Sequence, residues 1–218
     1  MELFKPKDIL KANPKLSFIG GEHFARFLML LLRFDKLNRV YNQIGDKQGL
    51  EFIDELIKIL NINFLYDVEE LQKRVPKTGS AIVVSNHPFG GLESILLIKI
   101  LSQLRSDIKI VSTQLLQKID PISEFFLEED AFNRKNDKGA LISGTDQASA
   151  HLENGGILCL FPAGDVSQFD AYRVLSDTQW QYNTLKFIRH QKVPIVPIHF
   201  QGNNSRLFYL MGNILPSL

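Results

Sequence analysis

The chain has 218 residues, of which 44% are hydrophobic and 22% charged, and its formal net charge is +1. This composition is typical of a globular chain that can bury a core, and it excludes a disordered or membrane-spanning one. The near-zero charge gives no overall attraction to nucleic acid, and no apolar run approaches the length that a membrane-spanning helix needs.

The first 75 residues are predicted to be mainly helical. Residues 1–20 contain Pro6, Pro14 and a Gly20-Gly21 pair, so we expect them to be irregular. From Glu22 onward apolar residues recur at helical spacing, and a second helix is predicted between Leu50 and Leu60. The apolar stripe of the first helix consists of Phe24, Phe27, Leu28 and Leu31.

The charge of this leading part differs from that of the rest. Residues 1–50 hold nine Lys and Arg against five Asp and Glu, so they carry +4 and the remainder carries −3. A basic segment beside an apolar helical stripe predicts peripheral attachment to an anionic lipid surface. The alternative is a solvated basic face with the stripe packed in an ordinary core.

After Pro76 apolar strands alternate with helices. Strands are predicted at 81–85, 108–112, 157–161 and 195–200, and helices at 92–104, 139–153 and 180–190. Continuous apolar strands between helices indicate an α/β fold with a mostly parallel central sheet flanked by helices. The only cysteine, Cys159, lies in a strand and can form no internal disulfide, which fits a cytoplasmic location.

The expected organisation is therefore a helical, membrane-associating element over residues 1–75 and an α/β domain over residues 76–218. The sequence stops at Pro216-Ser217-Leu218, just after an apolar segment that begins at Leu207, and an α/β domain cut short at its C-terminus is one interpretation of this ending.

The first strand leads directly into the block Asn86–Glu93, which contains His87. Sites in open α/β sheets lie at the carboxyl ends of strands, and Pro88, Gly90 and Gly91 shape a turn that can bring Glu93 toward the imidazole. A carboxylate on one ring nitrogen leaves the other free to accept a proton. The pair is thus a candidate base for a hydroxyl, with backbone N–H groups of the turn as oxyanion donors. A histidine that merely caps a turn is the alternative.

Three further blocks follow along the chain. The loop 129–136 carries adjacent Arg134 and Lys135, which could hold a phosphate. The block Phe161–Ser167 follows another buried strand, and the last block spans 193–202. The sequence has no glycine-rich nucleotide fingerprint and no Gly-x-Ser-x-Gly nucleophile motif.

In this order and spacing the four blocks resemble the glycerolipid and lysophospholipid acyltransferase family, most closely its bacterial hemolysin-like branch, which includes lyso-ornithine-lipid acyltransferases. The resemblance covers roughly residues 70–210. It implies that His87 is the catalytic base and Glu93 its acidic partner. The second, third and fourth blocks match at Phe132, Arg134, Asn136, Phe161, Pro162, Gly164 and Pro197. Substrate binding is accordingly expected from Arg134, Lys135, Phe161, Pro162, Gly164 and Asp165.

Two positions depart from the family pattern. Five residues separate His87 from its acid, which is a glutamate, whereas the broad family has an aspartate after four. Ala163 stands where the family usually carries a glutamate associated with the acceptor headgroup, and the acid follows later as Asp165. The second departure argues against glycerol-phosphate acceptors and leaves room for an acyl-amino-acid acceptor.

The resemblance implies transfer of a fatty acyl group from acyl-CoA or acyl-carrier protein to the hydroxyl of a lysolipid. The acceptor would be a lysophospholipid or a lyso-amino-acid lipid at the inner face of the cell membrane, in membrane lipid synthesis. Neither a metal nor a cofactor is expected. The alternatives are an acyl thioesterase, in which water replaces the lipid hydroxyl, and a non-catalytic lipid-binding or membrane-active protein.

Overall fold

The computed structural model describes residues 3–12, 20–31, 33–112, 114–128, 143–169, 175–205 and 208–209. The chain forms two compact units. One comprises residues 1–62 and 204–218, and the other comprises residues 63–203. Among the described residues, no helix combines the length and the apolar character that crossing a bilayer requires.

The first unit is helical. Its core contains Ile9, Ala25 and Leu28, which are buried together from the first two helices. The helices of this unit are α1 (Pro6–Ala12), α2 (Gly21–Leu31), α3 (Phe34–Ile44) and α4 (Gly49–Ile59).

Helix α1 corrects the expectation of an irregular start. Pro6 occupies its first position, where the fixed φ of proline suits a helix and the missing N–H needs no partner. The Asp8 carboxylate accepts a hydrogen bond of 2.8 Å from the Lys5 N–H, which closes the first turn. The proline therefore starts a helix here, whereas the sequence prediction treated it as a breaker.

The second unit is built on a five-stranded sheet in which every pair is parallel, in the order β3-β2-β4-β1-β7. This confirms the predicted α/β fold with a parallel sheet flanked by helices. The strands are β1 (Ala81–Ser85), β2 (Ile108–Ser112), β3 (Phe126–Glu128), β4 (Ile157–Leu160) and β7 (Ile195–Ile198). A separate antiparallel pair is formed by β5 (Gln168–Phe169) and β6 (Leu175–Ser176).

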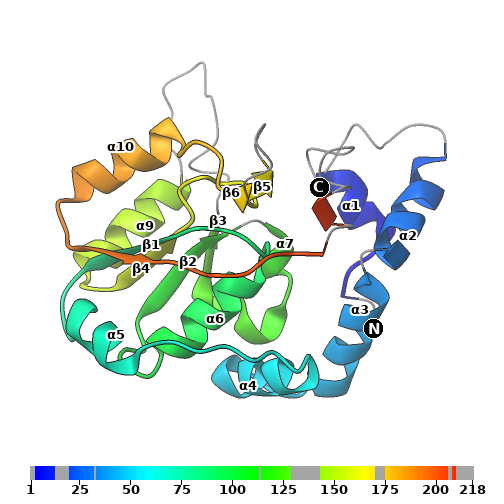
Figure 1. The fold of residues 1–218 in the computed structure, drawn as a ribbon, viewed down its shortest axis with the longest axis horizontal. Coiled ribbons are helices and arrows are strands. Elements are labelled where there is room, and N and C mark those ends of the chain that lie inside the picture. The colour runs from blue at the N-terminus through cyan, green and yellow to red at the C-terminus, as the bar shows by residue number, and fades with distance from the viewer. Residues whose placement is uncertain are drawn as a thin grey trace. The chain divides into compact units, whose positions relative to one another are not determined.

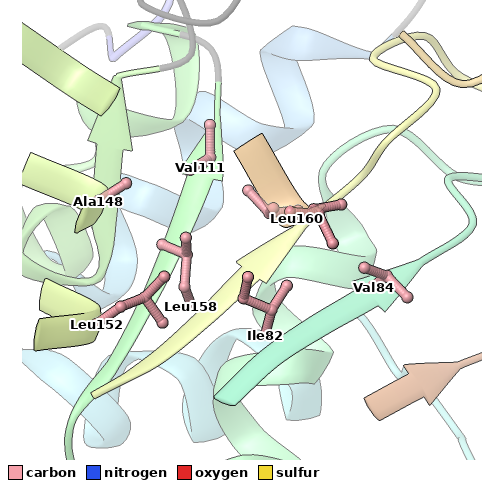
Figure 2. Packing of buried hydrophobic residues seen from close by; sticks show 8 residues of the cluster. Ile82, Val84, Val111, Ala148, Leu152, Leu158 and Leu160 are labelled. Atoms are coloured by element: carbon pink, nitrogen blue, oxygen red, sulfur yellow. The ribbon is translucent and has the colours of Figure 1, made fainter. Parts of the chain in front are cut away.

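Helices cover both faces of the sheet, with α6 (Leu92–Leu101) on one face and α9 (Ser143–Glu153) and α10 (Tyr182–Gln191) on the other (Figure 1). Because side chains alternate along a strand, Ile82 and Leu158 face α9, where they pack with Leu152 (Figure 2). The remaining elements of this unit are α5 (Val68–Arg74), α7 (Gln114–Gln117) and the 3₁₀ helix η2 (Asp120–Phe125).

The register of the central strands decides where the site lies. Val84 of β1 pairs with Leu160 of β4 and with Pro197 of β7. The three strands therefore end close together, at one edge of the sheet. The segments that leave this edge are the first, third and fourth sequence blocks, which is where parallel α/β sheets place their sites.

Candidate active site

Asn86 holds the ends of two strands together just before the histidine. Its Nδ2 donates to the Phe200 carbonyl at 2.9 Å, and the Phe200 N–H donates to its Oδ1 at 2.7 Å. The side chain thus continues the pairing of β1 and β7 beyond the last ladder residues. Asn86 accordingly fixes the point from which His87 leaves the sheet.

The turn after His87 is closed by Glu93, in the first turn of α6. Gly90 and Gly91 have φ values of 80° and 116°, which non-glycine residues adopt only with strain. The Glu93 carboxylate accepts from the Phe89 N–H through Oε1 and from the Gly91 N–H, at 3.2 Å, through Oε2. These two N–H groups point at Glu93, so the oxyanion role predicted for them does not fit this conformation.

The structure brings His87 and Glu93 together, as the sequence predicted. Their Nδ1 and Oε2 atoms are 3.6 Å apart, slightly beyond a hydrogen bond, while the Glu93 side chain is fully buried and His87 is 16% exposed. Within the described part of the chain, His87 Nδ1 has no hydrogen-bond partner. A small movement of the ring would make Glu93 that partner, a tightening that is common when substrate binds.

Burial acts on both members of this pair. It lowers the pKa of His87 to about 4, opposed by the negative charge of Asp177. It raises the pKa of Glu93 to about 6, opposed by hydrogen bonds from backbone N–H groups and aided by Asp177. At neutral pH the imidazole is therefore neutral and the carboxyl ionised, the states that a base and its partner require.

The third block lies against the histidine. The Phe161 ring packs on the His87 ring with centroids 4.4 Å apart and an angle of 32° between the planes. The turn behind it is fixed by the Gly164 N–H, which donates to the Phe161 carbonyl at 2.9 Å, and by the Gln181 N–H, which donates to the Pro162 carbonyl at 2.8 Å. Ala163 is buried, whereas Asp165 is exposed.

Two residues at this site carried no assigned role in the sequence prediction. Asp177, just after β6, accepts through Oδ1 from the His87 N–H at 3.2 Å and from the Ser167 hydroxyl. Ser167 belongs to the third block, so its place in a block was a signal. Asp177 is 90 residues from His87 and gave no local signal. The predicted residues of the second block, Phe132, Arg134, Lys135 and Asn136, lie outside the described residues.

Comparison with known proteins identifies the family to which the chain belongs. A family model described as "Acyltransferase" matches residues 11–218. The chain is similar to the lyso-glycine lipid O-acyltransferase of Bacteroides thetaiotaomicron, with 25% identity over 193 residues, which cover 88% of this chain and 68% of the relative. It is also similar to the lyso-glycine lipid O-acyltransferase of Phocaeicola vulgatus, with 24% identity over 212 residues, which cover 95% and 71%. The enzyme class implied by the four blocks is thereby confirmed, and the chain belongs to the acyltransferase family.

Proposed function

We propose that the chain transfers a fatty acyl group from the thioester of acyl-CoA or acyl-carrier protein to the hydroxyl of a lysolipid. The observation that carries this proposal is the His87–Glu93 pair at the carboxyl ends of the strands. The imidazole is neutral, and a buried carboxylate oxygen lies 3.6 Å from its Nδ1. The family assignment and the O-acyltransferase names of both relatives support the same reaction.

In the proposed mechanism Glu93 faces Nδ1, so the tautomer protonated there leaves Nε2 free to act as the base. Nε2 removes the proton of the lipid hydroxyl, whose oxygen attacks the thioester carbonyl. The tetrahedral intermediate collapses, the C–S bond breaks, and the imidazolium returns its proton to the leaving thiolate. The products are an ester and a free thiol, and no acyl-enzyme forms.

For the acceptor, we propose a lyso-amino-acid lipid in preference to a lysophospholipid. Both relatives carry names that specify a lyso-glycine lipid. Ala163 presents a buried methyl group where the family usually has a glutamate for the headgroup. The role of Arg134 and Lys135 is still a prediction: their positive charges would pair with an anionic headgroup or with a phosphate of the donor.

The proposed place of action is the inner face of the cell membrane, where the acceptor resides. The +4 charge of residues 1–50 and the exposed side chains of Phe27 and Leu30 on α2 support reversible attachment. An amphiphilic acceptor could then reach the enzyme without leaving the lipid surface.

The test supplies purified protein with acyl-CoA or acylated carrier protein, with and without a panel of lysolipids. Free thiol is measured by a colorimetric reagent, and new lipids are identified by mass spectrometry. We expect thiol release that depends on the acceptor, with the acylated amino-acid lipid as the main product. Equal release without acceptor would identify a thioesterase, and no release with any donor would contradict a catalytic function.

A further inference from the structure

The main chain of His87 is held on both sides by a closed set of hydrogen bonds. Its N–H donates to Asp177 Oδ1 at 3.2 Å, and its carbonyl accepts from the Ser167 N–H at 2.9 Å. The Ser167 hydroxyl donates to the same Asp177 oxygen. The three residues thus form a ring of contacts that fixes the backbone from which the imidazole projects.

This ring joins segments that are distant in sequence. His87 follows β1, Ser167 ends the third block after β4, and Asp177 follows β6. Since the Phe161 ring of that block also packs on the imidazole, the third block contacts His87 through both its main chain and its side chain. Ser167 and the main chain of His87 therefore cannot move independently without breaking this ring.

We propose that Asp177 is a positioning residue for the acyl transfer proposed above: it fixes the main chain of His87 and places a negative charge that stabilises the imidazolium formed during the reaction. The inference rests on the proposed function, because it concerns the same base. It assigns the site a second carboxylate, which acts through the histidine.

Glu93 and Asp177 contact different parts of His87. Glu93 faces Nδ1 and is held by N–H groups of the turn, whereas Asp177 faces the backbone N–H of the histidine. In the described part of the chain, these are the titratable groups placed against His87. The charge of Asp177 raises the pKa of both His87 and Glu93, so its removal should lower both.

Two variants separate geometry from charge. Asp177→Asn keeps an oxygen that can accept both hydrogen bonds but removes the negative charge. Ser167→Ala removes the hydroxyl bond but keeps the charge of Asp177 and the backbone bond from Ser167 to the His87 carbonyl. Asp177→Ala removes charge and both bonds, and Glu153→Gln, which neutralises an exposed carboxylate on α9, is the matched control.

We expect Asp177→Ala to lower kcat by about tenfold to a hundredfold with little change in KM, as for a base held out of place. Asp177→Asn should move the acidic limb of the kcat/KM profile to lower pH. Ser167→Ala should lower kcat less than Asp177→Ala and leave that limb in place. Glu153→Gln should match the wild type, and thermal unfolding of each variant checks that it is folded.

A second measurement needs no turnover and keeps the test independent of the proposed reaction. The ring resonances of His87, assigned by their loss in His87→Ala, should titrate at lower pH in Asp177→Asn than in the wild type. Wild-type kcat in folded Asp177→Ala, or an unmoved His87 titration in Asp177→Asn, would overturn the inference. A wild type without acyl transfer would refute the proposed function, while the His87 titration would still decide the electrostatic role of Asp177.

Discussion

At the scale of the residue, burial shifts the pKa values of His87 and Glu93 in opposite directions and reverses their usual order. The imidazole pKa falls to about 4 and the carboxyl pKa rises to about 6, because burial disfavours the charged form of each. The imidazole of His87 is therefore neutral throughout the physiological pH range, and one of its ring nitrogens can accept a proton. In the proposed mechanism, proton transfer to His87 creates a buried cation, which the nearby carboxylates would have to stabilise.

Replacing His87 by alanine tests the base. We expect His87→Ala to lower turnover by roughly two to four orders of magnitude, the usual contribution of a general base. The midpoint of thermal unfolding should change little, since Nδ1 of the imidazole makes no hydrogen bond to the described residues. A purified variant with near-normal turnover would remove His87 from the mechanism.

The pH dependence of activity should report Glu93. Since His87 stays neutral down to about pH 4, activity should rise with pH through about 6, as Glu93 loses its proton and can stabilise the imidazolium. Glu93→Gln should abolish this limb and weaken turnover less than His87→Ala does. An unchanged limb in a folded Glu93→Gln protein would assign the titration to another group.

Glu93→Gln should also lower the free energy of unfolding, and this loss has to be measured beside the kinetics. The glutamine has one accepting oxygen, so its amide group would oppose one of the two N–H donors of the turn, that of Phe89 or Gly91. Leaving such a buried donor unpaired costs about 1–3 kcal/mol. Chemical denaturation of Glu93→Gln therefore has to accompany the kinetics.

What sequence could predict at this scale depended on distance along the chain. His87 and Glu93 share one turn, so strand, glycines and acid together predicted their proximity. Asp177 is joined to them only by the tertiary fold, and no local pattern marks it. The hydrogen bonds from the Phe89 and Gly91 N–H groups to Glu93 could not be predicted either. The direction of an N–H depends on backbone angles that composition does not specify.

At the scale of the element, the predictions for β1 and β2 were confirmed residue by residue, at 81–85 and 108–112. Both are short continuous apolar runs, the pattern of strands buried on both faces. The strand β3 was missed because its three residues are too few to show any period. Helix α1 was missed because a proline at a first helical position resembles a proline that ends one.

The turn after β4 allows a matched test of glycine. Gly164 has φ +75°, and a Cβ there would lie 2.0 Å from Gln181 Nε2, whereas Gly79 has φ +81° and open space around it. Both alanine variants should lose about 1–2 kcal/mol to backbone strain. Only Gly164→Ala should also lower activity, because it displaces the Gln181 side chain beside the third block. Equal activity of the two folded variants would show that this turn does not shape the site.

At the scale of the whole molecule, the excess positive charge and the candidate active site lie in different units of the chain. The +4 charge lies in residues 1–50, within the helical unit, whereas His87, Glu93 and Asp177 lie in the sheet unit. The α2 stripe is itself divided. Leu28 is fully buried in the core of its unit, and Phe27 and Leu30 are 55% and 65% exposed. Of the predicted stripe, Phe27 is therefore the most exposed member, and Leu30 is an exposed neighbour that the sequence prediction did not include.

Vesicle sedimentation with the 218-residue chain tests this attachment. The wild type should pellet with anionic vesicles at low salt and be released at high salt, because screening shortens the reach of the basic residues. The double variant Phe27→Ser/Leu30→Ser should stay largely in the supernatant, since it loses the apolar part of the contact and retains the charge. The control is Leu65→Ser/Val68→Ser, which removes two exposed apolar side chains from the other unit and should pellet like the wild type. If the two double variants pellet equally, α2 is not the membrane contact, and its exposed side chains are ordinary surface.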